Sequence, residues 1–258
     1  MKDIKKYLDE EREGSYSFYF EDLDGSYTYA YNHQVQKTSA GTMKLMLAVV
    51  FLKKVEEDLF SMDELVAIKE ADKRPGSGIL ADFIERPYTI RELIVSMLII
   101  GDNTAASKLM QLLGVKQTNQ MFQELGLKNT VMSDEPGVEG NLTTAEDMAL
   151  VLKALYNHTY LNESNSDFII ELIRRRVKSK IRLYMPARYQ YQIASKTGDA
   201  PGIENEMAII NTDSGNFIFT IMASDLPNSV YGQISLAKAG MMLHKAIEED
   251  WNGEGEVK

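Results

Sequence analysis

The sequence predicts an α+β fold of two lobes, in which an antiparallel sheet flanked by terminal helices joins an all-helical lobe. Strand patterns gather at the two ends of the 258-residue chain, and helical patterns fill its middle from about residue 41 to residue 185. Because a sheet must bury one face against other elements, the early and late strands pair most simply in one sheet. The first and last helices then cover one face of that sheet.

The N-terminal elements follow from two kinds of spacing. Within residues 3–13, three apolar side chains recur at helical spacing, which predicts a short amphipathic helix. Residues 16–20 and 27–31 are aromatic, alternating runs on either side of Asp-Leu-Asp-Gly at 22–25. Alternation around such a turn sequence is typical of a β-hairpin.

The later elements have their own start signals. Thr89 with Glu92 forms a capping box before the apolar run 93–100, and Thr143-Thr144-Ala145-Glu146 opens a helix that continues through Tyr156. The remaining predicted elements are strands at 192–195, 206–211 and 217–223 and a final helix at 233–249. No linker rich in Pro, Gly or Ser divides the chain, which predicts a single domain, 1–258. Its first lobe combines 1–38 with 187–258, and its helical lobe is 39–186.

Composition excludes several function classes. The net charge of −10 disfavours nucleic-acid binding, which needs a concentrated basic surface. The basic residues at 174–176, 178, 180 and 182 are interpreted as a solvated helical face. There is no cysteine, and His33, His158 and His244 lack ligand spacing, so we expect neither a metal site nor another cofactor.

The N-terminal residues carry charge but no apolar core of a signal peptide, and no membrane span is visible. The chain as written is therefore expected to be cytoplasmic, or exported if a signal was trimmed from it. The sequence gives no oligomeric state.

Three short motifs carry the chemistry: Gly-Thr-Met-Lys at 41–44, Gly-Asp-Asn at 101–103 and Lys-Thr-Gly at 196–198. In order and separation they resemble the Ser-x-x-Lys, Ser-Asp-Asn and Lys-Thr-Gly motifs of serine β-lactamases and penicillin-binding proteins. Segments 40–47, 75–80, 89–105 and 143–148 also look like class A β-lactamase segments. The resemblance implies a β-lactamase/transpeptidase-like arrangement of the two lobes, with the site between them.

The first motif has a physical rationale of its own. Lys44 lies three residues after position 41, so the two share one helix face. A partly desolvated lysine there can accept a proton from a hydroxyl at position 41. The resemblance implies an oxyanion hole formed by the backbone N–H groups of position 41 and of Asp199, the residue after Gly198.

The resemblance also assigns the remaining site residues. It implies that Lys196 and Thr197 bind the substrate carboxylate. It implies further that Asn103 hydrogen-bonds the substrate amide and Lys44.

The sequence departs from the family at two hydroxyl positions. Gly41 replaces the nucleophilic serine, and Gly101 replaces the second serine, which relays a proton to the leaving nitrogen. A hydrogen side chain forms no acyl-enzyme, so the covalent route is closed as written. Thr42 and Ser39 carry the alternative hydroxyls, but the absence of any nucleophile is the favoured interpretation. Ser39 could instead cap the helix.

The loop before the Thr143 cap is a third departure. Glu135 and Glu139 are its candidates for a deacylating base, and spacing selects neither; Asn141 matches the family's loop asparagine. We therefore expect a serine-hydrolase fold that acts on or binds β-lactams or D-Ala-D-Ala-like carboxylates, with impaired catalysis. The alternative is a non-enzymatic binding or regulatory protein whose cleft holds a peptide or another anionic ligand. A natural pseudoenzyme and an inactivated laboratory variant both fit the two glycines.

Overall fold

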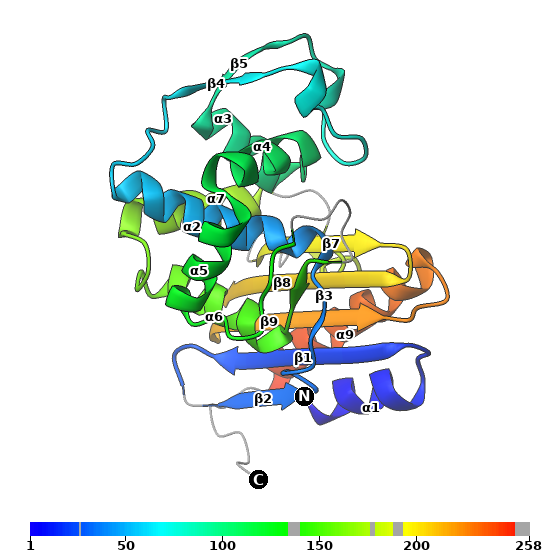
Figure 1. Cartoon of the computed structure of the whole chain (residues 1–258). Coiled ribbons are helices and arrows are strands. Elements are labelled where there is room, and N and C mark those ends of the chain that lie inside the picture. The colour runs from blue at the N-terminus through cyan, green and yellow to red at the C-terminus, as the bar shows by residue number, and fades with distance from the viewer. Residues whose placement is uncertain (26, 134–139, 176–178, 188–192, 251–258) are drawn as a thin grey trace.

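The structure is a computed structural model that describes residues 1–25, 27–133, 140–175, 179–187 and 193–250. Its central sheet has the strand order β2-β1-β9-β8-β7, and every neighbouring pair is antiparallel. The strands are β1 (Ser15–Asp22), β2 (Thr28–Tyr31), β7 (Ile193–Ala200), β8 (Ile203–Thr212) and β9 (Gly215–Ser224). The early hairpin and the late strands thus form one sheet, as predicted (Figure 1).

The terminal helices, α1 (Lys2–Glu10) and α9 (Ser229–Asp250), pack against each other and cover one face of the sheet (Figure 1). Apolar side chains of α1, α9 and the sheet form a core on this side, including Leu8, Phe18 and Leu243. Several aromatic rings stack within it, such as Phe20 on Phe217. The tyrosine-rich hairpin therefore serves packing in the described structure.

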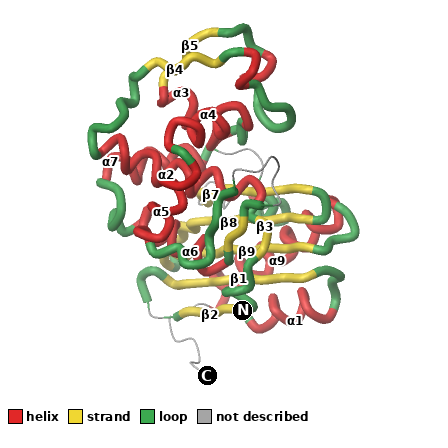
Figure 2. The backbone as a smooth tube through the Cα atoms, viewed as in Figure 1, coloured by secondary structure: helices red, strands yellow, loops and turns green. Residues whose placement is uncertain are grey.

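The opposite face of the sheet meets the helical part, which lies at the other end of the molecule in Figure 2. Its helices are α2 (Met43–Glu56), α3 (Ile90–Ile99), α4 (Asn103–Leu113), α5 (Val115–Leu125), α6 (Ala145–Tyr156) and α7 (Glu163–Arg174). Helix α2 runs through the centre of the second core, where the continuous run from Leu45 to Leu52 is buried. A helix that is apolar all round needs such burial on every side.

Helix starts agree with the sequence signals. Thr89 Oγ1 accepts from the N–H of Glu92, and the Glu92 carboxylate accepts from the N–H of Thr89, which completes the capping box of α3. Thr144 Oγ1 caps α6 by accepting from the N–H of Asp147. These bonds satisfy amide groups that would otherwise lack partners in the first helical turn.

Some predicted boundaries were too narrow, and short strands were missed. Strand β7 extends to Ala200 and so includes the whole Lys-Thr-Gly motif, and α9 begins four residues before the predicted start. The missed pairs are β3 (Lys37–Thr38) with β6 (Leu142–Thr143) and β4 (Leu65–Ile68) with β5 (Arg86–Thr89). Strands this short carry too few alternating residues to be recognised by periodicity. Single-turn 3₁₀ helices occur at η1 (Ala40–Thr42), η2 (Glu70–Asp72) and η3 (Leu80–Asp82).

The interpretation of the basic run as a solvated helical face is wrong for its last members. Helix α7 ends at Arg174. Lys180 is only 7% exposed and forms an ion pair with Glu204. Burial lowers the pKa of the Arg182 guanidinium, an effect that Glu206 opposes.

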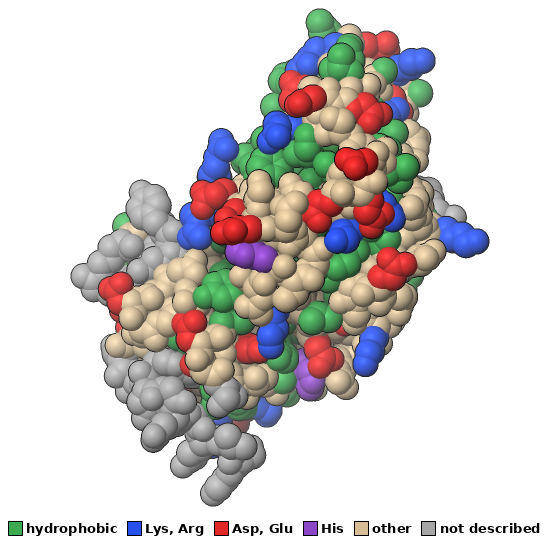
Figure 3. All heavy atoms as spheres, turned by 90° about the vertical axis from the view of Figure 1, so that its left-hand side faces the viewer, with side chains coloured by type: hydrophobic (Ala, Val, Ile, Leu, Met, Phe, Trp, Pro, Cys, Tyr) green, Lys and Arg blue, Asp and Glu red, His purple; other side chains and the backbone are tan. Residues whose placement is uncertain are grey.

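Elsewhere, acidic and basic side chains are interspersed over the described part of the face in Figure 3. No described helix is long and apolar enough to cross a membrane.

Candidate active site

The site forms where β7 crosses the start of α2. The turn η1 lies against β7 and β8, and its first residue, Ala40, has a left-handed backbone with φ of 47°. This conformation is unfavourable for alanine by about 1 kcal/mol or more, so the surrounding packing must impose it. A Cβ at position 198 would lie 2.7 Å from both the Gly41 nitrogen and the Ser39 oxygen. Glycine is therefore required at 198 for the strand to approach η1 this closely.

Position 41 faces the Lys-Thr-Gly motif directly. A Cβ there would lie 2.9 Å from the Thr197 carbonyl oxygen, 3.3 Å from Gly198 Cα and 3.7 Å from Lys196 Nζ. The first distance is shorter than a van der Waals contact, so the strand backbone fills the space that a side chain would need. The first and third motifs thus meet in space, as the family resemblance implies, and they meet most closely at two glycines.

Lys44 joins the first motif to the second. Its Nζ donates to the Gly101 carbonyl at 2.7 Å and to Asn103 Oδ1 at 2.6 Å. The Asn103 side chain is fixed in turn, because its Nδ2 donates to the Pro75 carbonyl at 2.8 Å. The backbone N–H of Asn103 donates to the Ser77 carbonyl at 2.8 Å. All three motifs and the loop at 75–80 therefore converge around the start of α2.

The second motif is anchored by a buried carboxylate. Asp102 is 1% exposed, and its Oδ1 caps α4 by accepting from the N–H of Ala105 at 2.9 Å. Its Oδ2 accepts from the N–H groups of Ile79 and Leu80 at 2.7 and 2.9 Å. Gly101, just before it, has φ of 75°, a conformation that glycine adopts at little cost. Asp102 thus positions the turn on which Gly101 and Asn103 lie.

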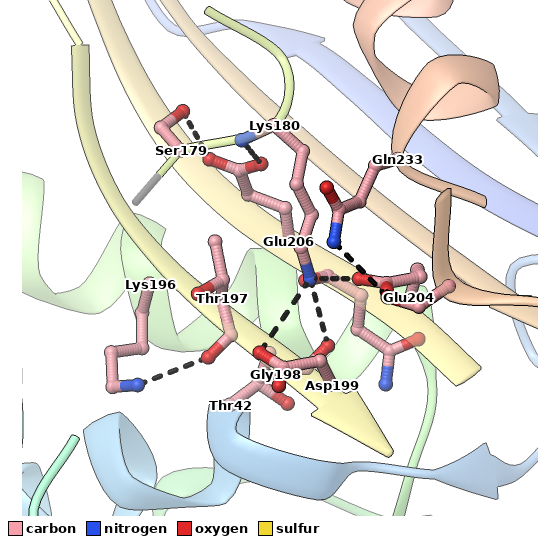
Figure 4. Close-up of polar contacts among 12 residues, drawn as sticks. Thr42, Ser179, Lys180, Lys196, Thr197, Gly198, Asp199, Glu204, Glu206 and Gln233 are labelled. Carbon is pink, nitrogen blue, oxygen red and sulfur yellow. Dashed lines mark hydrogen bonds and ion pairs between the residues drawn. The ribbon is translucent and has the colours of Figure 1, made fainter. Parts of the chain in front are cut away.

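Lys196 and Lys180 lie on opposite sides of β7 in Figure 4. Lys196 is 1% exposed, and its Nζ donates to the Thr197 carbonyl at 3.0 Å. Side chains alternate along a strand, so Lys196 and Gly198 share the face toward η1, whereas Thr197 and Asp199 share the face toward α9. Thr197 reaches position 41 through its carbonyl group.

The two alternative hydroxyls are both buried and already bonded. Thr42 Oγ1 donates to the Ser39 carbonyl at 2.6 Å, and Ser39 Oγ donates to the Asn141 carbonyl at 3.0 Å. The possibility that Ser39 caps the helix with its side chain is wrong, because its hydroxyl makes no capping bond. Asn141 Oδ1 accepts from the N–H of Ser133 at 2.9 Å, so this asparagine links the loop to η1. Glu135 and Glu139 lie outside the described residues.

The described residues contain no group of three or more His, Asp or Glu side chains arranged to hold a metal ion. His158 and His33 instead approach single carboxylates, those of Asp167 at 3.3 Å and Glu146 at 3.9 Å. The chemistry available at the site is therefore that of lysine ammonium groups, an amide side chain and backbone N–H groups.

Sequence reasoning missed the charged residues behind β7. Glu204 and Glu206 are both fully buried on β8, and both interact with the segment at 179–182. Their signal in the sequence is the polar run Glu204-Asn205-Glu206, which precedes the apolar residues 207–210 of the same strand. Buried carboxylates need partners, so such a pattern indicates cations or amide donors packed against the strand.

Residues 1–247 match the family model described as the β-lactamase enzyme family. The chain therefore belongs to this family, whose fold and catalytic motifs are of the serine-hydrolase type.

Curated relatives match over part of their lengths. The chain is 27% identical over 143 residues to the D-alanyl-D-alanine carboxypeptidase DacF of Bacillus subtilis, covering 52% of this chain and 36% of that protein. It is 26% identical over 179 residues to the β-lactamase CTX-M-97 of Escherichia coli, covering 66% and 62% of the two chains. The chain thus spans less than two thirds of these relatives.

Solved structures confirm the fold over nearly the full chain. PBP-A superimposes with a TM-score of 0.89 at 24% identity, covering 96% of this chain and 95% of the other. A β-lactamase from Sphaerobacter thermophilus gives a TM-score of 0.84 at 22% identity, covering 91% and 92%. The two-lobe β-lactamase/transpeptidase-like fold predicted from the motifs is therefore correct.

Proposed function

We propose that the cleft binds a small carboxylate or β-lactam-like ligand without covalent catalysis. The observation that carries this proposal is the contact at position 41, where the Thr197 carbonyl occupies the space of a nucleophile's side chain. The neighbouring hydroxyls of Ser39 and Thr42 are buried and donate to carbonyl groups. Without a hydroxyl in reach, the site has no group to form an acyl-enzyme.

The ligand's negative charge would be bound by two kinds of group. Lys44 and Lys196 supply positive charge: Lys196 Nζ lies 3.7 Å from where a Cβ at position 41 would be, and Lys44 lies three residues after Gly41 with its Nζ on the Gly101 carbonyl. The backbone N–H groups of Gly41 and Asp199 supply oriented donors of the kind that bind oxyanions. A carboxylate fits this combination, because its two oxygens accept from both cations and amides.

The first test is the intact mass of the protein after incubation with benzylpenicillin. We expect an unchanged mass. An adduct, stable or transient, would overturn the proposal, because it would show that a discounted hydroxyl acts as nucleophile. Peptide mapping of that adduct would distinguish Thr42 from Ser39.

The second test is binding itself, measured by ¹⁵N-resolved NMR titration with citrate and with benzylpenicillin. We expect saturable shifts of the Gly41 and Asp199 amide signals that Lys196→Met weakens by at least tenfold, since a hydrogen bond to a charged group contributes about 1.5–3 kcal/mol. Lys153→Met, on the outer surface of α6, is the matched control and should bind as the parent does. A parent protein with no saturable shift for either probe would refute the anion site.

A peptide ligand is the second candidate. The side chains of Ile79 and Ile100 are 46% and 41% exposed. Ile100 lies two residues before Asp102 in the chain, and the N–H of Ile79 donates to the Asp102 carboxylate. Exposed apolar side chains beside a cationic site favour a ligand that carries both a carboxylate and an apolar group. A peptide ending in D-Ala-D-Ala with an aromatic third residue should then bind more tightly than citrate, and Ile79→Ser should remove the difference.

A further inference from the structure

A buried lysine lies behind β7, on the side away from Gly41. Lys180 Nζ donates to the Gly198 carbonyl at 3.2 Å and to the Asn205 carbonyl of β8 at 3.4 Å. It forms an ion pair with Glu204 and lies 3.9 Å from the Asp199 carboxylate. Figure 4 shows these contacts converging on the Lys180 ammonium group. The lysine therefore binds the backbone of β7 at Gly198, the last residue of the Lys-Thr-Gly motif.

The bond to Gly198 affects the next amide group. The carbonyl of Gly198 and the N–H of Asp199 belong to one peptide unit, and no cis peptide bond occurs among the described residues. In a planar trans unit the N–H points opposite to the C=O. The C=O and N–H groups of a strand lie roughly in the plane of the sheet, and Gly198 pairs with Asn205 of β8. A cation that holds the Gly198 carbonyl therefore helps to hold the Asp199 N–H, which points the opposite way. It also polarises that N–H, which strengthens the group as a donor.

Lys180 is itself held at two points by buried carboxylates. Glu204 is fully buried, and its second oxygen accepts from the Ser229 hydroxyl of α9. Glu206, also fully buried, accepts from the N–H of Lys180 at 2.8 Å and from the N–H of Ile181 at 3.1 Å. The lysine is thereby fixed at both its backbone and its ammonium group.

Stability alone does not account for this arrangement. A buried ion pair loses hydration of both charges, and replacing such a pair by apolar residues is often neutral or stabilising. Here the pair stands on the back of the strand whose front meets Gly41. The position of the Lys180–Glu204 pair behind β7, rather than its net contribution to stability, therefore indicates what it does.

We propose that Lys180, fixed by Glu204 and Glu206, is a positioning residue that aims the Asp199 N–H into the cleft and sets its strength as an anion donor. This inference rests on the proposed anion-binding function of the cleft. It assigns Lys180 an action on the ligand through the peptide unit, without contact between the lysine and the ligand.

The test removes the charge pair without leaving an unpaired buried charge. The double variant Lys180→Met with Glu204→Gln keeps side-chain volume and net neutrality. Its matched control is Lys153→Met with Glu21→Gln, which neutralises a lysine–glutamate pair between α6 and β1, away from β7. The single variant Lys180→Arg keeps the positive charge and serves as the conservative replacement.

Two readouts are taken on each protein: citrate affinity by NMR titration, and amide hydrogen exchange at Gly198 and Asn205, the paired residues whose carbonyl groups Lys180 binds. For the Lys180 double variant we expect affinity weaker by on the order of tenfold and exchange at Gly198 and Asn205 faster by at least as much. Exchange at the start of β7, at Ile193 and Ala194, should stay unchanged. The control pair should alter neither readout, and Lys180→Arg should recover most of the citrate affinity.

The possible results separate the two proposals. If the parent binds citrate and the Lys180 double variant binds it equally well, the positioning role is wrong. If the parent binds neither citrate nor benzylpenicillin, the proposed function fails. Hydrogen exchange then tests only whether Lys180 holds the backbone of β7. Unchanged exchange at Gly198 and Asn205 would overturn that contact, and faster exchange confined to those two residues would support it.

Discussion

Adding a single methyl group at position 41 tests how tightly the site is closed. Gly41 is not among the glycines with positive φ, so its backbone accepts an L-residue. In Gly41→Ala the new Cβ would lie 2.9 Å from the Thr197 oxygen and 3.3 Å from Gly198 Cα. Both neighbours are backbone atoms of β7, which cannot rotate away as a side chain would. The strand must shift by a few tenths of an ångström, as in an overpacked core.

Overpacking of this kind costs about 1–3 kcal/mol, and replacing glycine in the single 3₁₀ turn η1 returns only a fraction of the roughly 1 kcal/mol that it returns in a helix interior. We therefore expect a net loss of about 1–2 kcal/mol of unfolding free energy. For a chain of this length that lowers the Tm by roughly 2–8 °C, measured by scanning calorimetry. A Gly41→Ala variant as stable as the parent, or more stable, would refute the close contact between β7 and η1.

Gly41→Ser makes the same contact and adds a hydroxyl near Lys44 and Lys196. We expect a similar loss of stability together with an increase in intact mass equal to that of benzylpenicillin, since the hydroxyl restores the missing nucleophile. Gly41→Ala supplies the control, because it has the steric change without the hydroxyl and should form no adduct. A folded Gly41→Ser protein that gains no mass would show that the inferred site geometry is wrong.

Two further predictions concern buried charges. Asp102→Ala should lower the unfolding free energy by about 3 kcal/mol or more in urea titrations, because it orphans three amide donors, and Asp102→Asn should lower it less; equal losses would contradict the carboxylate's role. Burial lowers the pKa of Lys37 to about 8, an effect that Asp225 opposes. Folding then favours the neutral amine, so the stability of the parent relative to Lys37→Met should rise from pH 8 toward the unfolded pKa of 10.5, by up to about 3 kcal/mol. A difference between parent and variant that does not change with pH would contradict this assignment.

The elements that sequence predicted well are those whose signals are local. The capping box at Thr89 and the helix start at Thr144 depend on residues three positions apart. The structure has the complete box at Thr89 and a side-chain cap at Thr144. The aromatic hairpin likewise needs only its own alternation and turn. The three motifs also predicted the overall fold, because their order along the chain identified the family.

The contacts that sequence could not predict join residues far apart in the chain. Lys180 lies in a run of basic residues that looks like a solvated surface, and only the packing of that segment against β8 buries it beside Glu204. The closeness of Thr197 to Gly41 depends on how far η1 approaches the strand. Neither feature has a local pattern, because each is decided by tertiary distances of a few tenths of an ångström.

The buried polar groups near Gly41 are consistent with the proposed binding role of the site. Lys196, Asp102 and Lys180 are all nearly inaccessible to solvent, and burying an ionised group costs free energy unless its partners compensate for lost hydration. For the Lys180–Glu204 pair, apolar residues of similar volume would often be neutral or stabilising. Here the charges instead fix two turns and one strand end around Gly41, which is the arrangement that an anion would stabilise on binding. Saturating ligand should therefore raise the Tm of the parent, and Lys196→Met should lose that increase even where its own Tm is unchanged.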